Sequence, residues 1–192
     1  MRRSPAILIV ILFALANAPL DAQRGRRRGE PIPSWSIEPI MRASIIKDDA
    51  VTLAGGRVAR QMDSTLNLGV AGATMLTGSA ETQRVDGFER ITSMLYLGPS
   101  IELRDSLRGP SRFIVRATGL VGLAGFEEQT NDVINDGSTF FGGVEADVGI
   151  LVRLTRALQI SATAGVLYGW RVDGGPAIIS GPSAAFGIRF VR

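Results

Sequence analysis

Glu145 and Asp147 are the residues of this sequence whose types and spacing most suggest chemistry. Side chains two positions apart in a β-strand point to the same face, so the two carboxyl groups would lie close together. Paired carboxyl groups can do general acid and base work. The sequence has no histidine and no cysteine, which excludes histidine-activated nucleophiles and thiol catalysis. The carboxylate pair is therefore the remaining catalytic candidate.

The segment 140–154 predicts how this pair is held. Glu145, Asp147 and Arg153 share one parity, whereas the other parity is wholly apolar: Phe140, Gly142, Val144, Ala146, Val148, Ile150, Val152 and Leu154. This alternation indicates a strand with one apolar and one charged face. Strands of soluble proteins have a typical length of about 5–6 residues, whereas a strand that crosses a bilayer needs about 9–11 with two such faces. The segment favours a membrane-crossing strand.

Seven other segments alternate in the same way. With 140–154 they predict eight strands, at 35–46, 50–60, 64–77, 88–104, 112–126, 140–154, 157–170 and 178–191. Pro39 predicts a weakened strand or a bulge, and Gly55-Gly56 predicts a bend. The pattern predicts an all-β fold: a single antiparallel up-and-down transmembrane β-barrel of about eight strands, spanning residues 35–192.

From the second hairpin on, the links between these strands alternate in length, and the first outer link, Lys47-Asp48-Asp49, is the exception in being short. If the N-terminus lies on the inner side, the long links 78–87, 127–139 and 171–177 all fall on the outer side. Outer-membrane barrels have long external loops and short periplasmic turns. The link 127–139 contains acidic residues with the oxygen ligands that Ca²⁺ prefers, but they lack the EF-hand spacing, and we predict a solvated loop. We predict neither a metal site nor a cofactor.

The first residues predict export. Arg2 and Arg3 precede an apolar run from Ala6 to Ala16, followed by small residues that suit cleavage, so residues 1–22 are predicted to be a signal peptide. Residues 23–34 contain four arginines and two prolines and predict a basic, flexible leader. Two interpretations of the leader are open, a solvated tail or contact with an anionic surface. The mature chain has nearly balanced charges, so we expect no nucleic-acid partner.

Alternation alone does not separate a membrane barrel from a soluble one such as a lipocalin-like carrier of an apolar ligand. The apolar faces are long enough to cover an apolar band of about 25 Å. The opposite faces are rich in small residues, and Lys47 is the only lysine in the sequence. A solvated exterior normally carries many charged residues. These features favour the membrane barrel.

The charged residues of the predicted inward faces form one set: Glu102, Arg104, Arg116, Glu145, Asp147, Arg153 and Arg189. Charges inside a narrow barrel are costly unless they are paired, so we predict a structural polar network in the lumen. Arg116 could pair with Glu145 or Asp147 on the neighbouring strand. Catalysis by the carboxylates and a gate for small ions are the alternatives.

Aromatic residues gather at the ends of the predicted strands. Barrels place aromatic rings at both membrane interfaces, whereas core aromatics favour strand centres. We therefore predict an aromatic girdle, with packing in an ordinary core as the alternative. Its members are Trp35, Phe88, Phe113, Phe126, Phe140, Tyr168, Trp170 and Phe190.

The last nine residues, Ala184 to Arg192, alternate apolar or aromatic residues at Phe186, Ile188 and Phe190. They resemble the C-terminal strand by which bacterial outer-membrane β-barrel proteins are recognised for assembly, although two residues follow the last aromatic. In size and layout the mature chain resembles the small eight-stranded members of this family.

This resemblance implies a bacterial outer-membrane location after export, contact with outer-membrane lipid, and contact with the barrel-assembly machinery through the C-terminal strand. Enzymes of similar shape use histidine, which this chain lacks. We therefore expect a non-enzymatic structural or surface-interaction protein that acts through its external loops on an unknown ligand. A narrow channel for ions or small solutes is the alternative.

Overall fold

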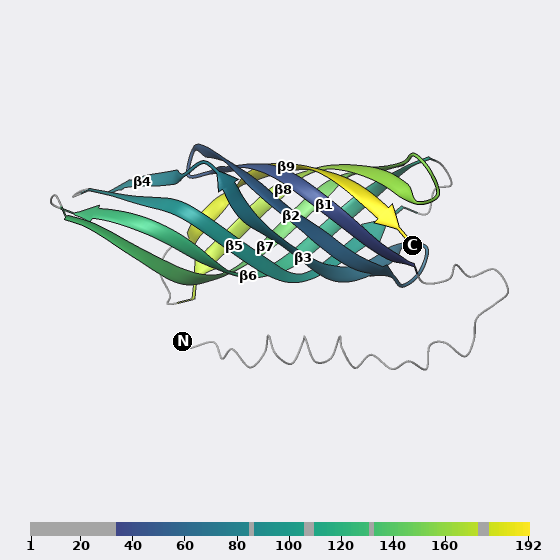
Figure 1. Cartoon of the computed structure of the whole chain (residues 1–192), viewed down its shortest axis with the longest axis horizontal. Coiled ribbons are helices and arrows are strands. Elements are labelled where there is room, and N and C mark those ends of the chain that lie inside the picture. Colours follow the sequence, from purple (N-terminus) through teal and green to yellow (C-terminus); the bar gives the residue numbers. More distant parts are fainter. Residues whose placement is uncertain (1–33, 85–86, 106–109, 131–132, 173–176) are drawn as a thin grey trace. The chain divides into compact units, whose positions relative to one another are not determined.

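The computed structural model describes residues 34–84, 87–105, 110–130, 133–172 and 177–192 (Figure 1). The predicted signal peptide and all but Ser34 of the predicted leader lie outside these residues. The strands are β1 (Trp35–Ile46), β2 (Asp49–Gln61), β3 (Leu66–Thr77), β4 (Ala80–Arg84), β5 (Gly87–Arg104), β6 (Ser111–Thr130), β7 (Val133–Arg153), β8 (Leu158–Arg171) and β9 (Ala177–Val191).

These strands form one closed antiparallel barrel. The sheet order is β3-β2-β1-β9-β8-β7-β6-β5-β4, and β3 also pairs with β5, which closes the sheet on itself. The wall has eight strands although nine are numbered, because β3 and β4 pair with successive parts of the same neighbour, β5. β4 continues the direction of β3 after the break at Gly78. Gly78 has a φ of 98°, a conformation that suits glycine. The predicted all-β, eight-stranded barrel is confirmed.

Two segments that were predicted to be loops are largely β-strand, so this part of the prediction is wrong. The link 78–87 contains β4, and most of 127–139 belongs to β6 and β7, whose ladder continues to Thr130↔Val133. β4, β5, β6 and β7 therefore project beyond the other strands (Figure 1). Backbone hydrogen bonds hold an antiparallel ladder together whether or not its side chains are apolar, so the polar sequence there does not end the strands.

Pro39 does not break β1. The β1–β2 register runs without interruption through Pro39↔Gly56, whereas the β1–β9 pairing skips from Ile37↔Phe190 to Ile40↔Gly187. Proline has no N–H to donate to the ladder. The predicted weakening is thus confined to one side of the strand.

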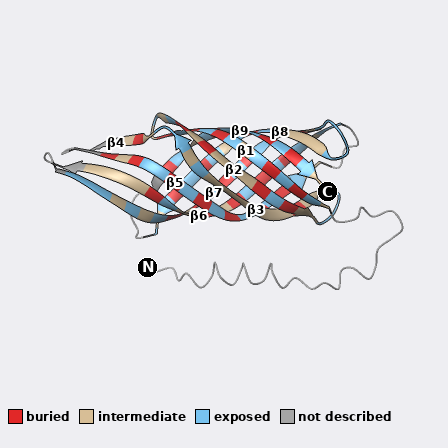
Figure 2. Ribbon diagram, viewed as in Figure 1, coloured by how far each residue is buried: buried red, intermediate tan, exposed pale blue. Residues whose placement is uncertain are grey.

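Burial alternates along the strands (Figure 2), and the polarity of the two faces is the reverse of that in a soluble barrel. The outward side chains are apolar and exposed, for example Ile37 at 59% and Val148 at 50%. The inward side chains include charged residues, and Glu102 and Arg189 are 0% exposed. Among the described residues no helix is long and apolar enough to cross a membrane.

The interior is layered along the barrel. The start of β1 and the end of β9 lie at one end of the barrel, where Trp35 N–H donates to the Arg192 carbonyl oxygen at 3.0 Å; we call this the terminus end. Towards the opposite end the inward side chains form an apolar cluster: Ile46, Val51, Leu53, Ala80, Ile91, Met94, Tyr96, Leu120, Ala124, Phe141, Leu167 and Ile179. The buried charged residues lie between this apolar cluster and the terminus end, except Glu89, which lies beyond the cluster in the projecting part of β5.

Candidate functional site

Six charged residues meet inside the barrel near the terminus end. They come from β1, β2, β5, β6 and β9, and we call them the four-arginine cluster: Glu38, Arg57, Glu102, Arg104, Arg116 and Arg189. Their side chains are at most 8% exposed. Four guanidinium groups therefore surround two carboxylates in a space that excludes bulk water.

Glu102 is the centre of this cluster. Its Oε1 accepts from Asn67 Nδ2 at 2.6 Å, from Arg104 Nε at 2.8 Å and from Arg189 Nη1 at 2.9 Å. Its Oε2 accepts from Arg57 Nη1, Arg116 Nε and Arg189 Nη2 at 2.5, 2.7 and 2.5 Å. Every arginine of the cluster thus donates to this one carboxylate, which offsets the cost of burying it.

Glu38 is the second anion. Arg189 donates from Nε and Nη2 to Glu38 Oε2 at 2.9 and 2.6 Å, and so bridges the two glutamates. Arg116 Nη2 donates to Glu38 Oε1 at 2.7 Å, and Ser161 Oγ donates to the same oxygen at 2.5 Å. The Glu38 carboxylate therefore joins β1 to β6, β8 and β9 across the lumen.

A second group of buried polar residues lies between this cluster and the apolar layer. Arg42 donates from Nη1 and Nη2 to the two carboxylate oxygens of Asp147 at 3.1 and 2.8 Å, and from Nη2 to Glu145 Oε1 at 2.6 Å. Tyr96 Oη donates to Glu145 Oε2 at 3.1 Å, and Arg42 Nη1 also donates to Ser183 Oγ at 2.7 Å. We call these five residues the Arg42 cluster.

Two glycines leave room for these clusters. A Cβ at Gly187 would lie 2.8 Å from both Glu38 Oε1 and Ser161 Oγ, and a Cβ at Gly165 would collide with Asp147 Oδ1. Both positions lie on the inward face of strands that flank the clusters. The small residues predicted for the inner face thus make space for long polar side chains across the lumen.

The structure brings together six of the seven charged residues that the sequence places in the lumen. Glu102, Arg104, Arg116 and Arg189 lie in the four-arginine cluster, and Glu145 and Asp147 lie in the Arg42 cluster. Arg153 does not join them, because β7 ends at this residue and its side chain is exposed at the terminus end. The predicted pairing of Arg116 is also wrong, since Arg116 pairs with Glu38 and Glu102.

Three central residues escaped the sequence reasoning: Glu38, Arg42 and Arg57. They lie on β1 and β2, where the sequence argument followed the apolar parity and the disruptive Pro39 and Gly55-Gly56. The parity opposite Ile37, Met41 and Ile45 contains both Glu38 and Arg42. The charged residues of this opposite parity were the signal in the sequence that could have predicted their place in the lumen.

The carboxylate pair lies within a buried hydrogen-bond network. Glu145 and Asp147 are 8% and 2% exposed, and their oxygens accept hydrogen bonds from Arg42 and Tyr96. A general acid or base needs a substrate within hydrogen-bond reach. Among the described residues no set of three or more acidic, histidine or cysteine side chains is placed to hold a metal ion. Both carboxylates of the pair share the one guanidinium of Arg42.

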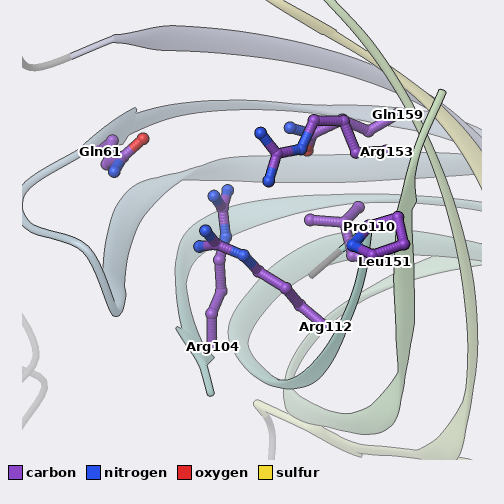
Figure 3. Close-up of a pocket in the computed structure, with 7 residues that line it drawn as sticks. All are labelled: Gln61, Arg104, Pro110, Arg112, Leu151, Arg153 and Gln159. Atoms are coloured by element: carbon purple, nitrogen blue, oxygen red, sulfur yellow. The ribbon is translucent and has the colours of Figure 1, made fainter. Parts of the chain in front are cut away.

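A cavity of about 160 Å³ lies at the terminus end, next to the four-arginine cluster. Figure 3 shows the guanidinium groups of Arg104, Arg112 and Arg153 directed towards a common space, with the amide of Gln61 across from them. Pro110, Leu151 and Gln159 complete the lining. Arg104 belongs to both features, because its Nε donates to Glu102 while its side chain lines the cavity.

Six residues of the predicted aromatic girdle point outward and are between 43% and 68% exposed: Trp35, Phe113, Phe140, Tyr168, Trp170 and Phe190. Trp35, Phe113 and Phe190 lie near the terminus end, and Tyr168 and Trp170 lie further along, with ring centroids 6.0 Å apart. Phe126 differs, because it has the inward parity of β6 and its ring lies under the Arg171 guanidinium at 5.5 Å. The side chain of Phe88 lies outside the described residues.

Comparison with solved structures identifies the fold. The N-terminal β-barrel domain of Pseudomonas aeruginosa OprF has a TM-score of 0.50 and 14% identity, with 83% of this chain and 97% of that chain covered. Neisserial surface protein A has a TM-score of 0.51 and 9% identity, with 85% and 98% covered. Yersinia pestis Ail, solved with the heparin analogue sucrose octasulfate, has a TM-score of 0.55 and 10% identity, with 84% and 100% covered.

No family model and no curated protein sequence matches this chain. The structural likeness shows that the chain has the fold of small eight-stranded outer-membrane barrels.

Proposed function

We propose that this chain is a bacterial outer-membrane barrel that is neither an enzyme nor an open channel, and that it presents its projecting strands as an interaction surface. The observation that carries the proposal is the reversed polarity of the barrel. Exposed apolar side chains cover the wall, whereas buried ion pairs fill the interior. That arrangement suits lipid outside and no solvent inside.

The filled interior supports a non-conducting barrel over a narrow channel. A water-filled pore that passed the four-arginine cluster would leave part of Glu102 or Arg189 accessible, yet both are 0% exposed. The apolar cluster forms a further layer towards the opposite end. The same filling speaks against a lipocalin-like carrier, whose lumen must hold an apolar ligand.

The projecting strands support the surface role. Among the described residues β4 is paired with β5 alone, and the β7–β8 ladder begins at Phe141↔Arg171. Before Phe141, β7 is paired along β6, and its one described backbone hydrogen bond on the other side is from Val172 N–H to the Phe140 carbonyl oxygen at 3.1 Å. Ile134 in this part is 63% exposed. Strand edges of this kind are surfaces on which other chains can dock.

Membrane insertion and conductance are tested with the purified chain. We expect extraction that requires detergent, different gel mobility before and after boiling, and no conductance steps in planar bilayers. Release into buffer without detergent would contradict the membrane location, and regular conductance steps would contradict the filled interior.

Orientation and surface contact are tested on intact cells. An epitope inserted between Thr130 and Val133 should be detected without permeabilisation, whereas one inserted in the link between β7 and β8 should not. A photo-crosslinking residue at Ile134 should then capture a protein, and the same residue at the wall position Val148 is the matched control. Equal capture at the two positions would contradict a role for the projecting strands.

Contact with the barrel-assembly machinery is part of the proposal. The outward residues Phe186, Ile188 and Phe190 of β9 are exposed, as a recognition strand requires. Changing Phe190 to serine should slow insertion into the outer membrane in cells, whereas Phe113 to serine, on β6, is the control. Equal slowing by both variants would contradict a recognition role for β9.

A further inference from the structure

The cavity at the terminus end gathers positive charge. Among the described residues seven line it, of which three are arginines and none is acidic. Asp105, which follows Arg104 in sequence, does not line the cavity, and its Oδ2 accepts the Phe113 N–H at 3.1 Å. Like charges held around one space repel each other unless an anion lies between them.

The neighbouring four-arginine cluster does not offset this charge. It places four guanidinium groups around two carboxylates, and those carboxylates already accept from all four. Arg104 joins the two features, since it donates from Nε to Glu102 and lines the cavity. Charges with low-dielectric walls around them focus an electrostatic field, and this field attracts anions to the cavity.

The donors suit a tetrahedral oxyanion. Guanidinium groups present planar forks of N–H donors that match phosphate oxygens. Gln61 accepts from Ser34 Oγ at 3.1 Å through its Oε1 and lines the same space, and its amide nitrogen carries two N–H donors. The guanidinium groups of Arg104 and Arg112 and the amide of Gln61 face one space from several sides. A tetrahedral oxyanion has oxygens on several sides, whereas a carboxylate has two, so this arrangement suits the tetrahedral group better.

We propose that this cavity, lined by Arg104, Arg112, Arg153 and Gln61, is a binding site for a phosphate group. Access is from the terminus end, because Arg153 is exposed and Arg112 is half-buried there. The phosphate group can belong to a soluble compound or to a phospholipid headgroup. The site is independent of the interaction surface proposed for the opposite end.

Binding is tested by calorimetric titration of inorganic phosphate into the full-length chain, folded in a phosphate-free detergent at constant low ionic strength. We expect Arg112→Gln and Arg153→Gln each to weaken binding about tenfold or more, since each removes charge-assisted hydrogen bonds. Arg156→Gln is the matched control, because Arg156 is exposed at the same end but does not line the cavity. It should change the affinity less than about twofold.

Gel mobility before boiling shows that each variant is folded. Phosphate should also raise the unfolding temperature of the unaltered chain and of Arg156→Gln, and raise it less for the two cavity variants. Absence of phosphate binding up to millimolar concentration would overturn the proposal. Equal weakening by all three variants would overturn it too, because the attraction would then come from the general charge of this end.

The source of the phosphate group is resolved by a second titration, with phosphatidylglycerol in mixed micelles and with glycerol 3-phosphate. If inorganic phosphate and glycerol 3-phosphate both bind, and if both depend on Arg112 and Arg153, the result supports the site and indicates a soluble ligand. The same dependence for phosphatidylglycerol with much tighter binding supports the site and indicates a headgroup. Binding of phosphatidylglycerol that is insensitive to both substitutions would contradict a headgroup ligand.

Discussion

The two buried clusters hold opposite ratios of charge inside one barrel. In the four-arginine cluster four cations share Glu38 and Glu102, whereas in the Arg42 cluster a single cation serves Glu145 and Asp147. Each cluster therefore depends most on its minority charge. Loss of a minority residue leaves several like charges buried together, whereas loss of a majority residue leaves the others still paired.

Removal of Glu102 is expected to have the largest effect. Glu102→Gln leaves four arginines around Glu38 alone, and breaking a buried pair in this way costs about 3–5 kcal/mol of unfolding free energy. Urea unfolding in lipid vesicles measures the loss. A cost below about 1 kcal/mol would show that the four arginines do not depend on this carboxylate.

Removal of Arg42 is expected to have the next largest effect. Arg42→Gln leaves Glu145 and Asp147 without their cation, at a cost of about 3 kcal/mol. The double variant with Asp147→Asn removes one of the two remaining charges and should recover part of the stability. If the double variant is less stable than Arg42→Gln, repulsion between the carboxylates does not cause the loss.

Removal of one majority charge is expected to cost little. Arg57 Nη2 has no hydrogen-bond partner among the described residues, although Nη1 donates to Glu102. Because three arginines would still donate to Glu102, Arg57→Met should change the unfolding free energy by about 1 kcal/mol or less. A loss as large as that of Glu102→Gln would contradict the dependence on the minority charge.

Asp63 lies outside both clusters, in the link between β2 and β3. Its substitution is expected to have the smallest effect on stability. The Thr65 N–H, Thr65 Oγ and Leu66 N–H donate to its Oδ1 and lower the pKa of Asp63. Because this pKa is lower in the folded chain, the charged carboxylate stabilises the fold at any pH above the unfolded pKa of about 3.9. This stabilisation is lost as the pH falls below that value.

Acid unfolding compares this residue with its neutral variant. Asp63→Asn should therefore reduce stability slightly at neutral pH and make it less dependent on pH below about 4. An unchanged pH profile would show that the link does not stabilise the charged carboxylate.

The sequence predicts the barrel well because alternation records which side of each strand is apolar. All eight predicted strands occur, and the segment 140–154 keeps its two faces. The alternation does not show where a polar ladder ends, because backbone hydrogen bonds alone extend it. For this reason β6 and β7 are longer than predicted.

The pairing of the buried charges is less predictable. Arg42 and Asp147 are 105 residues apart and lie on strands that are not neighbours in the sheet. Their contact depends on the closure and the register of the barrel, which no local pattern specifies. Arg116 shows the same limit, since it passes over its neighbour β7 and reaches Glu38 on β1 across the lumen.

The central claim, an apolar wall in lipid around a filled interior, is tested most directly by lipid contact at single positions. The chain has no cysteine, so one cysteine at a time can be introduced at Val144, Val148, Ile134 or Arg156 and labelled with a fluorophore in bilayers. Nitroxide lipids should quench the label strongly at Val144 and Val148, and weakly at Ile134 and Arg156. Equal quenching at all four positions, together with rapid labelling of Val148→Cys by a membrane-impermeant reagent, would contradict the account.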